Sequence, residues 1–417
     1  MSRRAFGAAL RQARLAAGLS LAELARQVHY TKGHLSKIEN GHKQATVALA
    51  RRCDQVLHAR GTLSALAPSS EAEQAPNQET PAGNAIAALA PWQPTTAGLH
   101  GEHAFPAPQP WGSATASTDH RGAADGLAVV LDQLRVLGRS LAPHLILPML
   151  VPQVGVLGGL AGEAAAGDRT RLLTLAARGA EFAGWMTQEA GDHVGAGQWT
   201  RRAADLALHA GDRDMVAYCL VRDAELRLYD SDGRSTVELT TAVRGFDGVR
   251  PRTRALAAHR EAQGHALVGA ARQCHEALAR AEELWAQSNE DAVALGSTTV
   301  TDLGSAVAGW CAFDLGDLDR AIELLGVGLA GIPPSSPRIR ALFGTRLALA
   351  HEAAGEFAEA ERLARSVLDV VPAIRSATVR SQLLQLASAL RRHSHSPGAL
   401  TLRADLADAL RVEPVHR

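Results

Sequence analysis

Apolar residues recur with the period of a helix along most of the chain, and no segment shows the strict alternation of a half-buried strand. Between residues 6 and 66 they mark short helices separated by turn residues. From about Asp125 to Val412 longer helices follow one another, and Gly-Asp, Gly-Glu or Pro marks the turns. The pattern predicts an all-α protein with a small N-terminal helical unit and a larger helical body.

The segment between these two regions has a different composition. It carries no Lys or Arg between Arg60 and Arg121, and eight of the 18 prolines lie between residues 68 and 110. Such a composition is typical of a flexible linker. Trp92 and Trp111 lie within it, either as short docking motifs or as isolated residues. The predicted domains are a small helical head at 1–67, a linker at 68–122 and a larger helical body at 123–417.

Residues 140–162 are uncharged for 23 positions, which is long enough to cross a bilayer. Pro143, Pro148 and Pro152 interrupt this stretch. We therefore expect a pair of buried core helices broken at the prolines rather than a membrane span. The polar, basic residues after Met1 do not resemble a signal peptide, so we expect a cytoplasmic protein.

Charge is distributed unevenly although the whole chain sums to zero. Residues 1–66 hold eleven Lys or Arg and three acids, a net charge of +8, so the other 351 residues sum to −8. All three lysines lie between positions 32 and 43. A basic head on an acidic body predicts that the head binds a polyanion, double-stranded DNA above all.

The same distribution argues against an enzyme. Because no lysine follows Lys43, the body has no residue for a phosphate-binding-loop lysine, a kinase lysine or a pyridoxal Schiff base. His393 and His395 are better explained as a solvated tail than as metal ligands. The four cysteines are widely spaced and are expected to be buried small residues. We expect no catalytic site, no metal and no cofactor.

The head contains the signals of a helix-turn-helix. Ser20, with Glu23 three residues later, forms a predicted capping box for a second helix that runs to about Val28. A third helix is capped by Thr31 and ends at Asn40-Gly41. Its outward positions are those of a recognition helix that enters the major groove; they are Lys32, Gly33, His34, Ser36 and Lys37.

The segment LRQARLAAGLSLAELARQVHYTKGHLSKIENGHKQAT resembles the xenobiotic-response-element (XRE) family over about residues 6–66, which implies the five-helix phage-repressor fold. Three departures are His29 at the usual turn glycine, Leu21 at a usual phosphate ligand, and Gly33, which has no side chain for reading a base. The resemblance implies base contacts by Thr31, Lys32, Gly33 and Lys37, phosphate contacts by Gly41, His42 and Lys43, and a structural ion pair between Arg14 and Glu39.

Internal repeats are visible in the body. The stretches Gly309–Pro333 and Leu347–Pro372 superpose with a period of 39 residues, sharing a turn glycine, an acid, a small alanine and a terminal proline. They resemble the tetratricopeptide repeat, which implies an α-solenoid with a concave face. Fainter copies place their turn glycines at Gly191, Gly233 and Gly269.

Together these features predict a dimeric, sequence-specific bacterial transcription regulator whose body dimerises and binds a peptide, protein or small-molecule effector. The alternatives are an adaptor or anti-factor whose head binds a protein, and a body that only dimerises. Candidate effector-binding residues come from the first helix of each repeat pair, which faces inward in tetratricopeptide arrays; they are Gln188, Tyr218, Arg222, His259, Asp302 and Arg346.

Overall fold

The computed structural model describes residues 3–17, 19–27, 35, 38–39, 49–50, 53, 57, 59, 62–66, 119–288, 295–296, 300–393 and 397–411. The chain divides into two units, residues 1–79 and residues 80–417. The described residues contain helices and no strand, so the predicted all-α class is confirmed. The division falls inside the predicted linker, most of which lies outside the described residues.

The first unit, the head, has its own apolar core. Its described helices are α1 (Arg3–Ala16), α2 (Leu21–Gln27) and α5 (Thr62–Leu66). The backbone of α1 passes very close to the third predicted helix, because a Cβ on Gly7 would lie 2.3 Å from the Ile38 carbonyl oxygen. The core is formed by side chains from every part of the head that is described; they include Leu10, Leu24, Ala25, Leu35, Ile38, Leu49 and Leu63.

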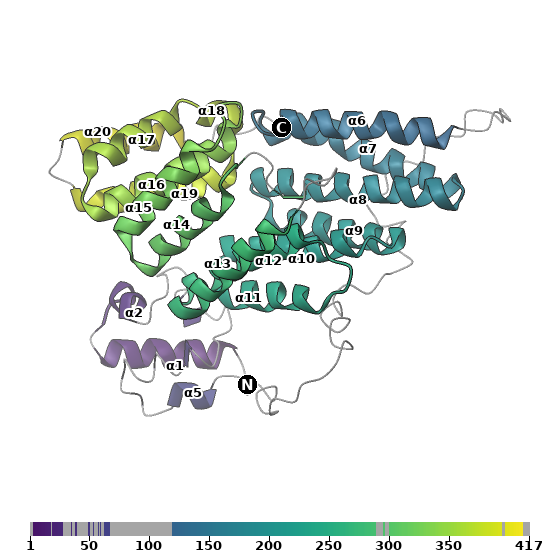
Figure 1. Ribbon diagram of the computed structural model, residues 1–417. Coiled ribbons are helices and arrows are strands. Elements are labelled where there is room, and N and C mark those ends of the chain that lie inside the picture. The colour runs from purple at the N-terminus through teal and green to yellow at the C-terminus, as the bar shows by residue number, and fades with distance from the viewer. Residues whose placement is uncertain are drawn as a thin grey trace. The chain divides into compact units, whose positions relative to one another are not determined.

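The second unit, the body, is a stack of antiparallel helix pairs that share one continuous core (Figure 1). It begins at His120, three residues before the predicted boundary. Its helices are α6 (His120–Leu137), α7 (Pro143–Glu163), α8 (Ala166–Glu189), α9 (His193–Ala210), α10 (Arg213–Tyr229), α11 (Gly233–Ala242), α12 (Pro251–Leu267), α13 (Ala271–Ala286), α14 (Leu303–Leu315), α15 (Leu318–Ala330), α16 (Pro337–Ala354), α17 (Phe357–Leu368), α18 (Val371–Ile374), α19 (Ala377–Ala389) and α20 (Pro397–Ala409).

Turn chemistry explains why the pairs form where the repeats predict them. At the α14–α15 turn Gly316 has a φ of +87°, a conformation that costs glycine little, and the Asp317 side chain accepts a bond from the Arg320 N–H to cap α15. A turn glycine with a positive φ also precedes α9, at Gly191, and α17, at Gly355. The turn between α10 and α11 differs, because Ser231 has the positive φ and the predicted turn residue Gly233 is the first residue of α11.

Helix α7 corrects the prediction of two buried helices broken at prolines. It is a single helix with Pro148 and Pro152 inside it. These prolines lie four residues apart, and both are exposed. The carbonyls that they leave without a helical N–H, on His144 and Pro148, therefore lie on the solvent side, where water can bond to them. α7 is also the one described helix long and apolar enough to cross a membrane, and 33% of its most apolar window is buried in the protein.

A buried arginine connects the beginning of the body to its end. Arg338, at the start of α16, is 1% exposed. Its guanidinium donates to the carbonyls of Gly138 (3.1 Å) and Ile374 (3.0 Å) and pairs with Glu189 of α8 (2.8 Å). Thr378 of α19 also donates to Glu189. These bonds join α8 to α16 and α19, so the helix stack closes back on its first helices.

Candidate functional site

Two features of the head match the predicted helix-turn-helix. The Arg14 guanidinium donates two hydrogen bonds to the Glu39 carboxylate, at 2.7 Å and 3.0 Å, and a third to the Leu19 carbonyl. The bond to Glu39 raises the pKa of Arg14. The Ser20 hydroxyl accepts from the Glu23 N–H, and the Glu23 carboxylate accepts from the Ser20 N–H, which completes the capping box.

The predicted DNA-contacting residues cannot be placed in the same way. All nine lie outside the described residues; they are Thr31, Lys32, Gly33, His34, Ser36, Lys37, Gly41, His42 and Lys43. Their neighbours Leu35 and Ile38 are fully buried in the head core. Burial at positions 35 and 38 matches the predicted inward face of the third helix.

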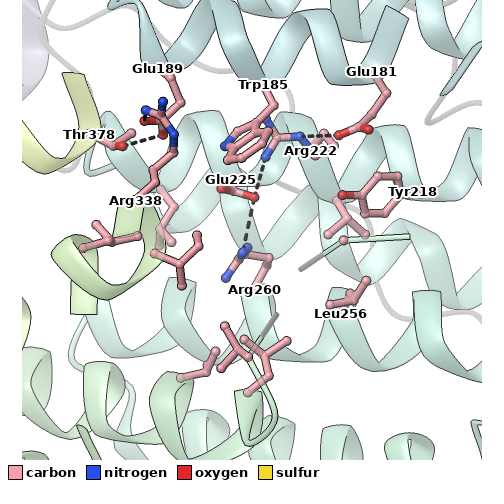
Figure 2. A pocket seen from close by; sticks show the side chains of 18 of the residues that line it. Glu181, Trp185, Glu189, Tyr218, Arg222, Glu225, Leu256, Arg260, Arg338 and Thr378 are labelled. Carbon is pink, nitrogen blue, oxygen red and sulfur yellow. Dashed lines mark hydrogen bonds and ion pairs between the residues drawn. The ribbon is translucent and has the colours of Figure 1, made fainter. Parts of the chain in front are cut away.

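The body contains a cavity of about 510 Å³ on the inner side of its helix stack (Figure 2). Its helical lining comes from α6, α8, α10, α12, α14 and α16, with one residue from α19. In the five pairs from α8–α9 to α16–α17 these are the first helices, which is the face that the repeat resemblance predicts to line the concave side.

One wall of the cavity is a network of ion pairs. The Arg222 guanidinium bonds to the Glu225 carboxylate at 2.7 Å and lies 3.4 Å from Glu181. Arg260 of α12 reaches the same Glu225 oxygen at 3.2 Å, so this carboxylate bridges α10 and α12, as Figure 2 shows. At the α6 end of the network, Arg135 pairs with the Glu181 carboxylate at 2.9 Å. The network therefore crosses four successive inner helices.

Burial and charge act in opposite directions on these groups. Burial alone would raise the pKa of the Glu225 carboxyl, but Arg222 and Arg260 outweigh it and lower that pKa. Burial alone would lower the pKa of Arg222, and Glu225 reverses the direction. Burial raises the pKa of Tyr218, whose ring lies on the same wall. The wall is thus ionised at Arg222 and Glu225, while the Tyr218 phenol stays neutral.

The remaining lining is aromatic and aliphatic. Trp185 lies near the guanidinium of Arg338, at 6.0 Å, and Trp310 packs edge-on against Phe343.

The lining as a whole holds six arginines and four carboxylates, an excess of two positive charges. The Nε atoms of Arg135, Arg178 and Arg260 are buried and have no hydrogen-bond partner among the described residues. The aliphatic lining residues are Val136, Val221, Leu228, Leu256, Val300, Leu303, Val307, Ile339 and Leu342.

Two of the six predicted effector residues, Tyr218 and Arg222, line the cavity. Gln188 is not part of the lining but contacts it, because its side-chain oxygen accepts a hydrogen bond from the lining residue Arg222 at 2.8 Å. Arg346 stacks on Trp310 at 3.8 Å and pairs with Asp314 at 3.3 Å, so it supports the wall from outside.

The other two predicted residues, His259 and Asp302, lie outside the cavity lining. His259 is 3% exposed and packs against Trp285, away from the cavity. Asp302 caps α14 by accepting from the Ser305 N–H at 2.8 Å.

Sequence reasoning missed most of the charged wall. Glu181, Trp185, Glu225 and Arg260 all lie on first helices, where they could have been chosen. Arg260, which lines the cavity, directly follows the predicted His259 on α12. The i,i+3 pair of Arg222 and Glu225 was the available signal, since such a pair lies on one helix face.

Other chemistry in the described residues is limited. They hold no cluster of three or more His, Cys, Asp or Glu placed to bind a metal ion. All four cysteines are buried. The predicted His395 lies outside the described residues, whereas His393 lies near the buried Glu352 carboxylate at 3.3 Å.

Comparison with known proteins identifies a family model for the head, at residues 5–67. Residues 5–67 match the family model of a helix-turn-helix domain, which indicates a DNA-binding regulator. No curated protein matches the chain. Among solved structures, the chain is similar to one described as "Crystal Structure of Rap Protein Complexed with Competence and Sporulation Factor" at 12% identity, covering 69% of this chain and 98% of that chain with a TM-score of 0.39.

Proposed function

We propose that the protein is a dimeric, sequence-specific transcription regulator of the XRE kind, whose head reads duplex DNA and whose body binds an effector. The observation that carries the DNA-binding part is the helix-turn-helix match at residues 5–67. The net charge of +8 on residues 1–66 supports it, because phosphate contacts by Lys and Arg supply most of the affinity for DNA.

The one acid next to the predicted recognition helix supports the same proposal. Glu39 would repel phosphate if its carboxylate faced the DNA. Both of its oxygens instead accept bonds from Arg14, and its side chain is 6% exposed. The head therefore neutralises this acid internally and leaves the lysines between residues 32 and 43 to act on the DNA.

The test begins with a binding site selected by the full chain from a pool of random duplexes. Lys37→Ala should weaken binding to that site by about 1–3 kcal/mol, with little effect on unrelated duplexes, if Lys37 reads a base. Lys43→Ala should weaken all duplexes alike and reduce the salt slope by about one, if Lys43 contacts phosphate. Arg320→Ala, which removes an exposed charge from the body, is the control and should leave both unchanged.

Two outcomes would contradict the DNA-binding proposal. If the full chain shows no salt-dependent duplex binding, the head serves as a protein-binding unit of an adaptor or anti-factor. If Lys37→Ala and Lys43→Ala both bind every duplex as the wild type does, the assignment of the third helix to the groove is wrong.

The effector is proposed to occupy the body cavity. Its volume of about 510 Å³ falls within the range of ligand pockets, and its mixed apolar and charged lining is of the usual kind. The excess of two arginines favours a ligand with acidic groups. An effector can change DNA affinity only if it prefers one state of the protein over another, and couplings of about 5- to 150-fold are typical.

The effector proposal is tested with the low-molecular-mass fraction of a cell extract. That fraction should change the affinity of the wild type for its selected site by a factor in this range. Arg260→Gln, which removes a cavity charge, should reduce the response, whereas Arg272→Gln on the exposed side of α13 should retain it. Equal responses of wild type and both variants would place the effector elsewhere, and no response of the wild type would leave the body as a dimerisation unit.

A further inference from the structure

Helix α7 exposes an apolar stripe on the surface of the body. Leu145, Met149 and Val156 are 48%, 46% and 51% exposed. Pro152, between Met149 and Val156, and Gly159, beyond Val156, are also exposed on this stripe. No charged residue occurs from position 140 to position 162. A soluble protein rarely leaves such a surface uncovered, so the stripe indicates an interaction site.

The spacing of the stripe indicates what kind of partner covers it. Positions 145, 149, 152, 156 and 159 alternate intervals of four and three residues. This is the seam by which one helix packs along another in a coiled coil. The opposite face of α7, with Ile146, Leu150, Val154 and Leu157, is buried in the body core. α7 is therefore a helix with two apolar faces, one of which has no partner among the described residues of the body.

The position of α7 in the solenoid makes the exposed face more informative. α6 and α7 are the first helices of the body in the described part of the chain. Terminal units of helical solenoids need a polar outer face to stay soluble, since no further repeat covers them. α6 also exposes apolar side chains, because Val129 and Val130 are 61% and 48% exposed.

We propose that a second copy of the chain covers this end, with the two α7 helices packed antiparallel about a two-fold axis near Pro152. The proposal names the surface behind the dimer of the proposed function and rests on that part of it. The two halves of the stripe differ: Leu145 and Met149 lie in the first half, and Val156 and Gly159 in the second. Antiparallel packing places Leu145 opposite the partner's Gly159, a large side chain against a small one, and Met149 opposite the partner's Val156.

The glycines leave room for this packing. A Cβ added at Gly158, Gly159 or Gly162 would meet no atom within 4 Å among the described residues. Small residues at a helix crossing let two backbones approach closely. Antiparallel packing also brings the exposed Glu163 toward the N-terminal end of the partner's α7, where the helix dipole favours a negative charge.

A membrane surface fits the same stripe less well. Helices that lie in a membrane interface combine an apolar face with Lys or Arg, and with aromatic residues at the boundary. α7 itself contains no Lys, Arg, Trp, Tyr or Phe, and its one charge is Glu163, although Arg139 and Arg169 flank it in the chain. The body as a whole is acidic. Repulsion from anionic lipids therefore opposes membrane binding, whereas a second α7 stripe carries no charge.

The first experiment measures the mass of the full chain by light scattering in the absence of DNA. The wild type should be a dimer at micromolar concentration. Met149→Glu combined with Val156→Glu should raise the dissociation constant at least about 100-fold, because the interface would bury unpaired charges. Val194→Glu, at a site on α9 that is 73% exposed, is the matched control and should stay dimeric. Circular dichroism should show the same helix content in all three.

The second experiment tests the register with single cysteines, and the four buried native cysteines keep the background low. Pro152→Cys should form a disulfide-linked dimer under oxidation, because residue 152 faces its own copy. Leu145→Cys and Gly159→Cys should cross-link when the two proteins are mixed, and neither should cross-link alone. A parallel pair would give the reverse, with each single variant linking to itself.

Three results would overturn the proposal. The wild type could be a monomer, or the double glutamate variant could dimerise as the wild type does. The wild type could also co-sediment with phosphatidylglycerol vesicles and lose this binding in the double variant, which would assign the stripe to lipid. Because none of these measurements involves DNA, a failure here is distinguishable from a failure of the head to bind its selected duplex.

Discussion

Arg338 offers the sharpest test of how the body is held together. Its side chain is 1% exposed, and its ion-pair partner Glu189 is 5% exposed. Arg338→Met keeps most of the volume and removes the charge together with the bonds to Gly138, Glu189 and Ile374. The variant leaves the Glu189 carboxylate buried without its cation.

The expected loss can be worked from this geometry. Removing one partner of a buried ion pair costs about 3–5 kcal/mol, because the remaining charge is uncompensated. Hydroxyl donors from Ser376 and Thr378 still bond to Glu189, which favours the lower end of that range. Against a total stability of about 5–15 kcal/mol, a loss of about 3 kcal/mol is large.

Urea unfolding of the full chain, followed by far-ultraviolet circular dichroism, measures the effect. Arg320→Met is the control, because its partner Glu323 and the arginine itself are both exposed, and it should show no measurable loss. Adding Glu189→Gln to Arg338→Met should cost less than the sum of the two single changes, since the double variant no longer buries an unpaired charge. A loss below about 1 kcal/mol for Arg338→Met would refute the view that this ion pair holds α8 and α16 together.

Two further predictions concern single residues of the body. A Cβ on Gly328 of α15 would lie 2.8 Å from the Ala306 Cα, whereas one on Gly326 of the same helix would meet no described atom within 4 Å. Gly328→Ala should therefore destabilise by about 1–3 kcal/mol and Gly326→Ala should stabilise by about 0.5–1 kcal/mol; melting shifts of the same sign would contradict this. Burial, assisted by Arg260, lowers the pKa of His259 from 6.5 to about 3. Below pH 6.5 the unfolded chain binds a proton at this site that the folded chain does not bind until about pH 3, so His259 makes stability fall as the pH falls through this window, by at most about 1.4 kcal/mol per pH unit. Urea midpoints at about pH 7.5 and pH 4.5 should therefore differ less for His259→Leu than for the wild type, and equal differences would show that His259 is not the group responsible.

Local signals in the sequence predicted local structure well. Ser20 and Glu23 form the capping box because both bonds lie within one turn. Gly316 and Gly355, found from the 39-residue period, have the left-handed conformation that ends a helix. The Arg14–Glu39 pair followed from family resemblance, since nothing in the spacing of residues 25 positions apart indicates contact.

The cavity was harder to predict because its lining depends on how each helix is rotated. A rotation of about 100° separates neighbouring positions on a helix. His259 and Arg260 are such neighbours, and only the packing of α12 against α10 and α14 decides which of them faces inward. Arg338 could not be identified at all, because its partners lie up to 200 residues away in the chain. The prolines of α7 misled the prediction because only the fold shows that both face solvent.

Closure of the helix stack has a consequence for how the body folds. An open solenoid folds by local spreading, because each repeat contacts only its neighbours and any repeat can serve as a starting point. Here Arg338 must meet Gly138 and Glu189, which are 200 and 149 residues away, before the last bonds form. Bringing such distant segments together costs chain entropy in advance of any gain, which slows folding. We therefore expect the helix pairs to assemble quickly and the joining of α8, α16 and α19 to be the late and slow step, before which the inner helices do not yet surround the cavity.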